Sequence, residues 1–136
     1  MIESIQKATD GLASEKVSFF KGYITALLWS SVREPDENGT PDINDDHDAD
    51  DMHPDTLKHQ LNDCLEFIAA TESLLAERSE FTGWDSMGHD FALTRNGHGT
   101  GFWDRGLVHD DKLTEHCKPF GEMFVYLGDD EKIHHI

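Results

Sequence analysis

The chain has 136 residues and carries 28 acidic against 11 basic side chains, which gives a formal net charge of −17. This length suits one domain with its own core, and a hydrophobic content of 37% argues against general disorder. The negative field excludes direct binding to nucleic acid or to an anionic membrane, since both require clustered Lys and Arg. The favoured partner is therefore a protein with a basic face.

The sequence carries no export or membrane signal. Its first twelve residues mix Glu3 and Asp10 into a polar run without the basic and apolar regions of a signal peptide. No apolar stretch approaches the roughly 20 residues needed to cross a bilayer. Cys64 and Cys117 form no C-x-x-C motif, so we expect both thiols to be reduced. Together with the missing export and membrane signals, this predicts a soluble cytoplasmic protein.

Two long amphipathic helices are predicted in the N-terminal half. Apolar residues recur with helical spacing over residues 15–32, after a capping residue at Ser14. A second apolar stripe over residues 56–78 follows Asp55, which we expect to cap it. Residues 33–55 between them contain three prolines, which predict an acidic loop.

Residues 81–136 are rich in glycine and aromatic residues, which predicts a β-rich half. A first hairpin is expected with strands at 91–93 and 102–103 around a glycine-rich turn. A short helix over 111–119 and a second hairpin within 123–136 follow. The sequence thus predicts a single α+β domain, in which the two N-terminal helices pack on a small antiparallel sheet built from both hairpins.

Three blocks of the sequence carry a resemblance. They are ALLWSS at 26–31, GHDFALTRNGHGTGFWDRG at 88–106 and VYLGDD at 125–130. Together they resemble a family of small acidic proteins encoded by tailed bacteriophages, with Ala92 standing where that family often has an aromatic residue. The resemblance implies a phage-type protein in the cytoplasm of an infected bacterium. It implies no chemistry, because the family has no established activity or catalytic residues.

The acidic run 34–55 contains ten carboxylates and no Lys or Arg. Asp42, Asn44 and Asp46 alternate as the oxygen ligands of a calcium loop do, but the central glycine and final glutamate of an EF-hand are missing. We therefore expect no cofactor, with a looser Ca²⁺ or Mg²⁺ site and a merely solvated loop as alternatives.

Closely spaced carboxylates can also imitate nucleic acid. Duplex DNA carries one charge per about 1.7 Å of its axis, and an acidic surface of similar density can occupy the basic groove of a DNA-binding protein. Our leading hypothesis is a binding protein, not an enzyme, that inhibits a basic host protein of the nucleic-acid-binding or defence class. The residues predicted to bind this partner are Asp42, Asp45, Asp46, Asp48, Asp50 and Asp51.

The glycine-rich segment suggests a competing function. Backbone N–H groups around Gly97, Gly99 and Gly101 can form an anion-binding nest for a phosphate or nucleotide, in a binding protein or an enzyme. The segment lacks the lysine of a P-loop and the following helix of a dinucleotide-binding fold, so a purely structural turn stays open. In this alternative the ligand-binding residues are Arg95, Asn96, His98 and Asp104.

Nine histidines raise the question of a metal site. His47, His53 and His59 recur every six residues, which does not place ligands on one helix face, and no H-E-x-x-H motif is present. His134 and His135 stand apart from them in the sequence. We expect separate surface histidines, no metal site and no catalytic triad.

Overall fold

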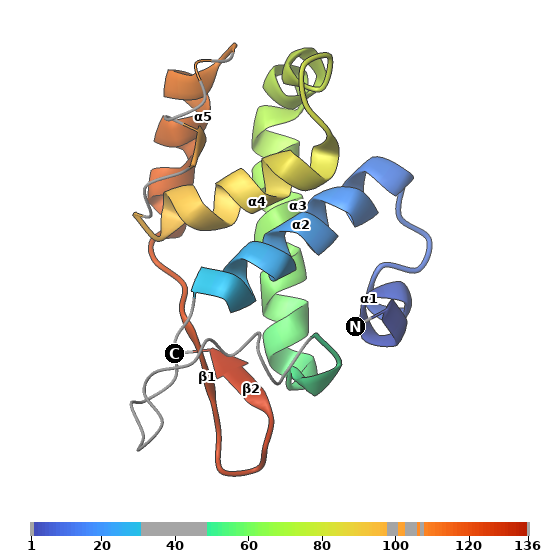
Figure 1. Ribbon diagram of the computed structural model, residues 1–136. Coiled ribbons are helices and arrows are strands. Elements are labelled where there is room, and N and C mark those ends of the chain that lie inside the picture. The colour runs from blue at the N-terminus through green and yellow to red at the C-terminus, as the bar shows by residue number, and fades with distance from the viewer. Residues whose placement is uncertain (1, 31–48, 98–100, 103–105, 107, 136) are drawn as a thin grey trace.

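The computed structural model describes residues 2–30, 49–97, 101–102, 106 and 108–135. The described residues form five α-helices, two short 3₁₀ helices and one antiparallel hairpin (Figure 1). The helices are α1 (Ile2–Ala8), α2 (Ser14–Ser30), α3 (Pro54–Arg78), α4 (Trp84–Arg95) and α5 (Asp110–Cys117). The remaining elements are η2 (Ala49–Asp51), η4 (Lys118–Phe120), β1 (Val125–Leu127) and β2 (Ile133–His135).

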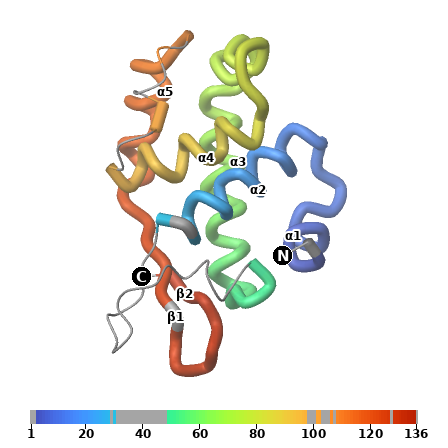
Figure 2. The backbone as a smooth tube through the Cα atoms, in the orientation of Figure 1, coloured from blue at the N-terminus to red at the C-terminus, as the bar shows by residue number. Residues whose placement is uncertain are grey.

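Helix α3 forms the axis of the molecule. Helices α2 and α4 lie side by side across it, and α5 stands beside the C-terminal end of α4 (Figure 2). The hairpin packs at the N-terminal end of α3, which is the lower end in Figure 1. None of the helices within the described ranges is long and apolar enough to cross a membrane.

The two long helices predicted from the sequence are confirmed as α2 and α3. The cap of α3 differs from the prediction. Pro54 takes the first helical position, where its missing N–H costs nothing, and Nδ1 of His53 accepts the backbone N–H of Asp55 at 3.2 Å. Asp55 therefore lies in the first turn, where its negative charge complements the helix dipole.

The core is built around aromatic rings from α2, α3 and α4. The rings of Phe67 and Phe91 stack with centroids 4.2 Å apart, and Phe19 lies about 6 Å from each of them. Phe120 approaches Phe91 edge-on at 5.3 Å, and Tyr23 packs on the same ring at 5.4 Å. These offset and edge-on arrangements are the ones that aromatic quadrupoles favour.

Helices α2 and α4 approach so closely that each needs a glycine at the crossing. A Cβ atom on Gly22 of α2 would lie 1.8 Å from the carbonyl oxygen of Asp85 on α4. A Cβ atom on Gly88 of α4 would lie 1.8 Å from the carbonyl oxygen of Phe19 on α2. Both obstacles are backbone atoms, so neither can move aside without separating the two helices.

The predicted α+β architecture is wrong, because the described residues are mostly helical and contain only one hairpin. Residues 91–93, expected as a strand, lie inside α4. The physical reason is the spacing of Met87, Phe91 and Arg95, which are four residues apart and all buried on one side of a helix. Residues 81–136 are therefore not a β-rich half.

Other predictions for the C-terminal half are confirmed. The short helix expected over 111–119 corresponds to α5 followed by η4. The second hairpin exists, with Tyr126 opposite His134 and Val125 opposite His135. Helix α1 was not predicted, because its seven residues carry too short an apolar pattern to stand out.

Candidate functional site

Two of the six aspartates predicted to bind a partner lie among the described residues. Asp50 and Asp51 belong to η2, and Oδ1 of Asp50 accepts the backbone N–H of Ser4 in α1 at 2.9 Å. This bond fixes the end of the acidic run on the N-terminal helix. The other four, Asp42, Asp45, Asp46 and Asp48, fall outside the residues that the structure describes.

The same end of the acidic run is joined to the hairpin. Met52 forms a parallel bridge with Ile133, and the backbone N–H of His53 donates to the carbonyl of Ile133 at 2.9 Å. Residues 49–55 and 128–135 together carry six carboxylates and one lysine, Lys132. We call these six the acidic pole: Asp50, Asp51, Asp55, Asp129, Asp130 and Glu131.

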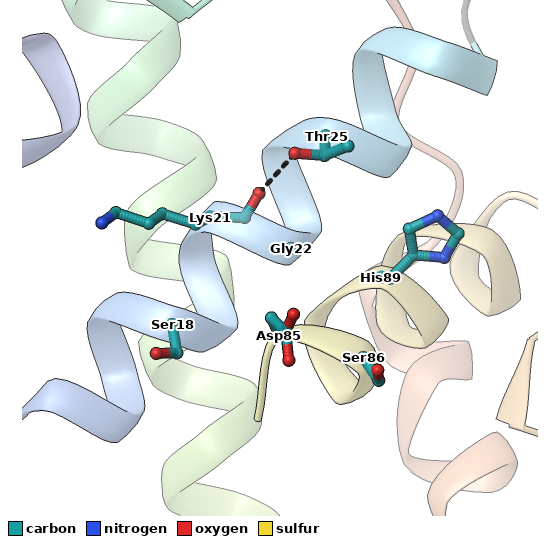
Figure 3. Close-up of a pocket in the computed structure, with 7 residues that line it drawn as sticks. All are labelled: Ser18, Lys21, Gly22, Thr25, Asp85, Ser86 and His89. Carbon is teal, nitrogen blue, oxygen red and sulfur yellow. Dashed lines mark hydrogen bonds between the residues drawn. The ribbon is translucent and has the colours of Figure 1, made fainter. Parts of the chain in front are cut away.

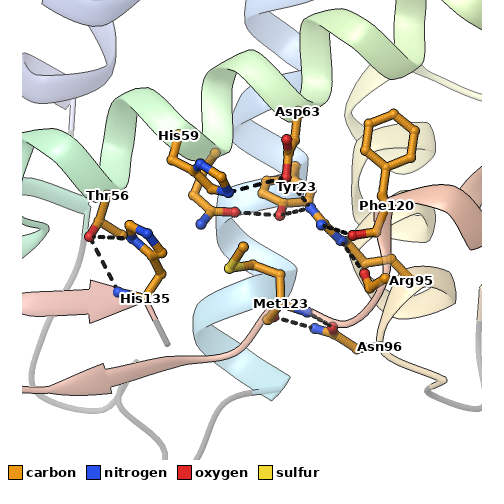
Figure 4. A network of polar contacts seen from close by, with 11 residues as sticks. Tyr23, Thr56, His59, Asp63, Arg95, Asn96, Phe120, Met123 and His135 are labelled. Atoms are coloured by element: carbon orange, nitrogen blue, oxygen red, sulfur yellow. Dashed lines mark hydrogen bonds and ion pairs between the residues drawn. The ribbon is translucent and has the colours of Figure 1, made fainter.

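Arg95, a residue of the alternative anion site, lies at the centre of a buried polar network (Figure 4). Its Nε donates to the carbonyl of Gly121 and its Nη2 to the carbonyl of Phe120, both at 3.0 Å. Its Nη1 donates to Oδ2 of Asp63 at 2.9 Å and to the hydroxyl of Tyr23 at 3.0 Å. Four of the five N–H groups of this guanidinium are thus used by the protein itself.

Tyr23 extends this network into the core. Its hydroxyl donates to Oε1 of Gln60 at 2.6 Å, while Nε2 of Gln60 has no hydrogen-bond partner among the described residues. Burial raises the pKa of Tyr23, and the nearby Arg95 opposes this only in part. The phenol therefore stays protonated and serves as a structural donor, not as a base.

Asn96, the second residue of the alternative site, is also engaged. Its Nδ2 donates to the carbonyl of Met123 at 2.8 Å, and its Oδ1 accepts the N–H of Met123 at 2.6 Å. This pair of bonds imitates a β-ladder and holds the segment before β1 against the end of α4.

We expect Asn96→Asp to destabilise the fold by about 1–3 kcal/mol, because a carboxylate oxygen would face the carbonyl of Met123 where an N–H now donates. Urea unfolding followed by circular dichroism measures this. The control is Asn62→Asp, the same chemical change at an exposed position of α3, which should leave the unfolding midpoint nearly unchanged. Equal stability of the two variants would contradict a structural role for Asn96.

The described part of the glycine-rich segment is packed against α4. A Cβ atom on Gly101 would lie 2.0 Å from Oγ1 of Thr94, and the same hydroxyl accepts the N–H of Phe102 at 2.9 Å. Gly97 adopts a left-handed φ of 69°, which glycine tolerates best. The other two residues of the alternative site, His98 and Asp104, lie outside the described residues.

A second buried arginine, Arg78, ties the block 88–106 to α3. Its Nη1 donates to the carbonyl of Val108 at 2.9 Å and to the carboxylate of Asp110. Its Nη2 lies 3.7 Å from Oδ2 of Asp90, and its guanidinium lies over the ring of Phe102. Asp90 thus balances the buried charge of Arg78. No ligand is needed to explain this polar residue of the block 88–106.

The surface carries a shallow hollow where α2 and α4 cross (Figure 3). It encloses about 540 Å³ and is lined by Ser18, Lys21, Gly22, Thr25, Asp85, Ser86 and His89. One of its hydroxyls is already used within α2, since Oγ1 of Thr25 donates to the carbonyl of Lys21 at 2.9 Å. Of the two glycines at the crossing, Gly22 is part of this lining.

A smaller hollow of about 350 Å³ lies beside Arg95, between the end of α4 and α5. The alternative anion site required a concavity at this place. Its lining includes Thr94, Thr114, Lys118 and Glu122. Because Arg95 directs four N–H groups to protein atoms, and its charge is balanced by Asp63, it has one N–H group left for a ligand in this hollow.

Four histidines from two distant parts of the sequence gather where the hairpin meets α3. His59 stacks on His135 with ring centroids 4.7 Å apart and planes at 4°, and His53 lies 5.1 Å from His134. The expectation of separate surface histidines is therefore wrong for these four. Two of these histidines lie at the start of α3 and two lie in β2. Only the fold brings these two segments together, so the sequence alone could not reveal the cluster.

Neither cysteine is a candidate nucleophile. Cys64 and Cys117 are free and buried, and burial raises the pKa of both thiols well above the usual range. Both therefore stay protonated at neutral pH. Within the described ranges, no group of three or more His, Cys, Asp or Glu side chains is arranged to hold a metal ion.

Comparison with known protein families, with curated protein sequences and with solved structures found no match to this chain.

Proposed function

We propose that this chain is a phage-type binding protein whose acidic run and acidic pole occupy the basic face of a nucleic-acid-binding host protein. The observation that carries the proposal is the charge of residues 34–55, ten carboxylates without a single Lys or Arg. Such a surface attracts a basic groove over long distances and raises the rate of association. A binding function in the bacterial cytoplasm is consistent with this chemistry.

Two contacts of the described residues support the proposal. The C-terminal end of the run is fixed to α1 through Asp50 and to the hairpin through Met52. The hairpin turn adds three more carboxylates to the same end of the molecule. Anchoring reduces the ordering entropy that a flexible acidic segment would otherwise lose on binding.

The buried networks disfavour the competing ligand-binding function. An anion site needs N–H donors that face a ligand, whereas Arg95 and Asn96 donate to carbonyl, hydroxyl and carboxylate groups of the protein. These bonds would have to break before either residue could hold a phosphate. We therefore propose an interaction protein without a bound cofactor.

A pull-down with a matched control tests the proposal. The bait is compared with a variant carrying Asn in place of Asp42, Asp45, Asp46, Asp48, Asp50 and Asp51. The control variant loses six exposed carboxylates elsewhere, by amide replacement of Glu3, Asp10, Glu15, Glu66, Glu72 and Glu80. The prey is the heparin-retained fraction of a bacterial lysate, which is enriched in nucleic-acid-binding proteins.

We expect the bait and the control to capture the same nucleic-acid-binding protein, and the six-aspartate variant to capture it at least about tenfold less. Capture should weaken with salt and with added duplex DNA, because both compete for the basic face. Equal capture by all three proteins, or none by the unaltered bait, would contradict the proposal.

A further inference from the structure

The contact between the hairpin and α3 is made largely by histidines. The His59 and His135 rings are stacked face to face, and Oγ1 of Thr56 hydrogen-bonds with Nδ1 of His135 at 2.9 Å (Figure 4). The outer face of the same strand carries His134, whose ring lies between those of Tyr126 and His53. Four imidazoles thus share one small interface.

The hairpin is also held by apolar and backbone contacts, since Val125 and Ile133 are buried in the core and the N–H of His53 donates to the carbonyl of Ile133 at 2.9 Å. Its strands are three residues each, and an isolated hairpin of this size is at most marginally stable in water. It further meets residues 49–56 through the Met52–Ile133 bridge and the bond from the N–H of His135 to Thr56 at 3.3 Å. Docking on α3 therefore combines a buried apolar part with the histidine rings, and the rings are the part that can titrate.

The charges around the stack favour neutral rings. The carboxylates that face it from α3 are Asp55 and Asp63. Asp63 already pairs with Arg95 at 2.9 Å, and the side chain of Asp55 is 89% exposed. On the strand side the neighbour is His134, whose own Nε2 lies 3.0 Å from Asp130. Oδ2 of Asp63 also lies 3.7 Å from Nε2 of His59, so this carboxylate, shared with Arg95, would compensate a charge on that ring in part. No carboxylate of the described residues is at ion-pair distance from His135, so two protonated rings at 4.7 Å would repel each other.

The pKa of His135 follows this environment. Desolvation lowers it below the ordinary value of 6.5, the charges of His59 and His134 lower it further, and Asp63 and Asp55 oppose the shift only in part. A group whose pKa is lower in the docked state binds a proton more readily when it is released. Its contribution to docking is complete above about pH 6.5 and is lost as the pH falls through the lowered pKa.

We propose that the His59–His135 stack is a proton-sensitive latch, in which neutral rings hold the hairpin on α3 and protonation releases it. Release removes the partner of Met52 and His53, and with it one of the two anchors of the acidic run. The latch is a property of the isolated chain. Only its effect on partner binding rests on the proposed function.

A pH titration of the unaltered protein followed by NMR tests the latch, between about pH 7.5 and about pH 5. We expect the imidazole signals of His135 to titrate below 6.5, and the amide signals of β1 and β2 to move to random-coil positions with the same midpoint. The amide signals of α2 and α4, whose crossing is remote from the hairpin, should stay dispersed. Hairpin signals that remain dispersed while His135 titrates would overturn the latch.

A pair of variants assigns the effect to the stack. His59→Phe keeps an aromatic ring against His135 but removes the charge that lowers the pKa of His135, so the midpoint should move to higher pH, towards 6.5. His116→Phe, the same change at an exposed position of α5, should leave the midpoint unchanged. Equal midpoints in the two variants would place the pH dependence elsewhere. Because no partner is needed, these results stand whether or not the pull-down succeeds.

Discussion

Replacing Gly22 by Ala is expected to destabilise the protein by about 3 kcal/mol or more, the upper end of what overpacking costs. The new methyl group would overlap the carbonyl oxygen of Asp85, which belongs to the backbone of α4. Gly88→Ala should act similarly through the carbonyl of Phe19. The direction of the change in stability is informative, because Gly→Ala inside an ordinary helix stabilises that helix by up to about 1 kcal/mol. Urea unfolding measures the change.

The control for the glycine variants is Lys21→Ala. This residue precedes Gly22 on α2 but is exposed, and both Lys and Ala are good helix formers. We expect its unfolding midpoint to match that of the unaltered protein. If Gly22→Ala and Lys21→Ala unfolded at the same urea concentration, the close crossing of α2 and α4 would be wrong.

Replacing Arg95 by Leu is expected to destabilise the fold by about 3–5 kcal/mol, the usual result of removing one partner from a buried ion pair. Asp63 would keep its charge without the guanidinium, and the carbonyls of Gly121 and Phe120 would lose their donor. Arg95→Lys should recover only part of this loss, because an ammonium group cannot donate in the same fork-shaped geometry. Thermal and urea unfolding measure both variants.

A surface ion pair is the matched control for Arg95. Lys118 and Glu115 are paired at 2.8 Å, but each side chain is 68% exposed. Lys118→Leu should therefore change stability by less than about 1 kcal/mol. Were Arg95 instead a free anion ligand, its replacement would abolish phosphate binding and leave the unfolding curve in place. That outcome would restore the ligand-binding alternative.

The sequence predicted the two long helices from their apolar period and missed α4, as it missed the short helix α1. Helices α2 and α3 repeat apolar residues over several turns, so their periods are unambiguous. Helix α4 is short and buried on several sides, and Phe91, Ala92 and Leu93 are all inaccessible. Three consecutive apolar residues before a glycine-rich segment fit a buried strand equally well, and the tertiary contacts decide between them.

The candidate site shows a similar division. The charge of the acidic run is a property of composition and is read directly from the sequence. The roles of Arg95 and Asn96 are not, because their partners Asp63 and Met123 are 32 and 27 residues away. A polar residue in a distinctive motif indicates a ligand or a distant structural partner, and only the fold separates these possibilities.

The glycine crossing also determines how the chain can vary. It joins α2 to α4 and so closes a loop that contains the whole acidic run together with α3. The entropy of closing such a loop depends only weakly on its length, by about 0.6 kcal/mol for each doubling. Insertions and deletions in the acidic run before Ala49, where its buried and anchored end begins, therefore cost the core little. Descendants of this sequence can change the length and charge pattern of that part of the run while keeping the same helical frame.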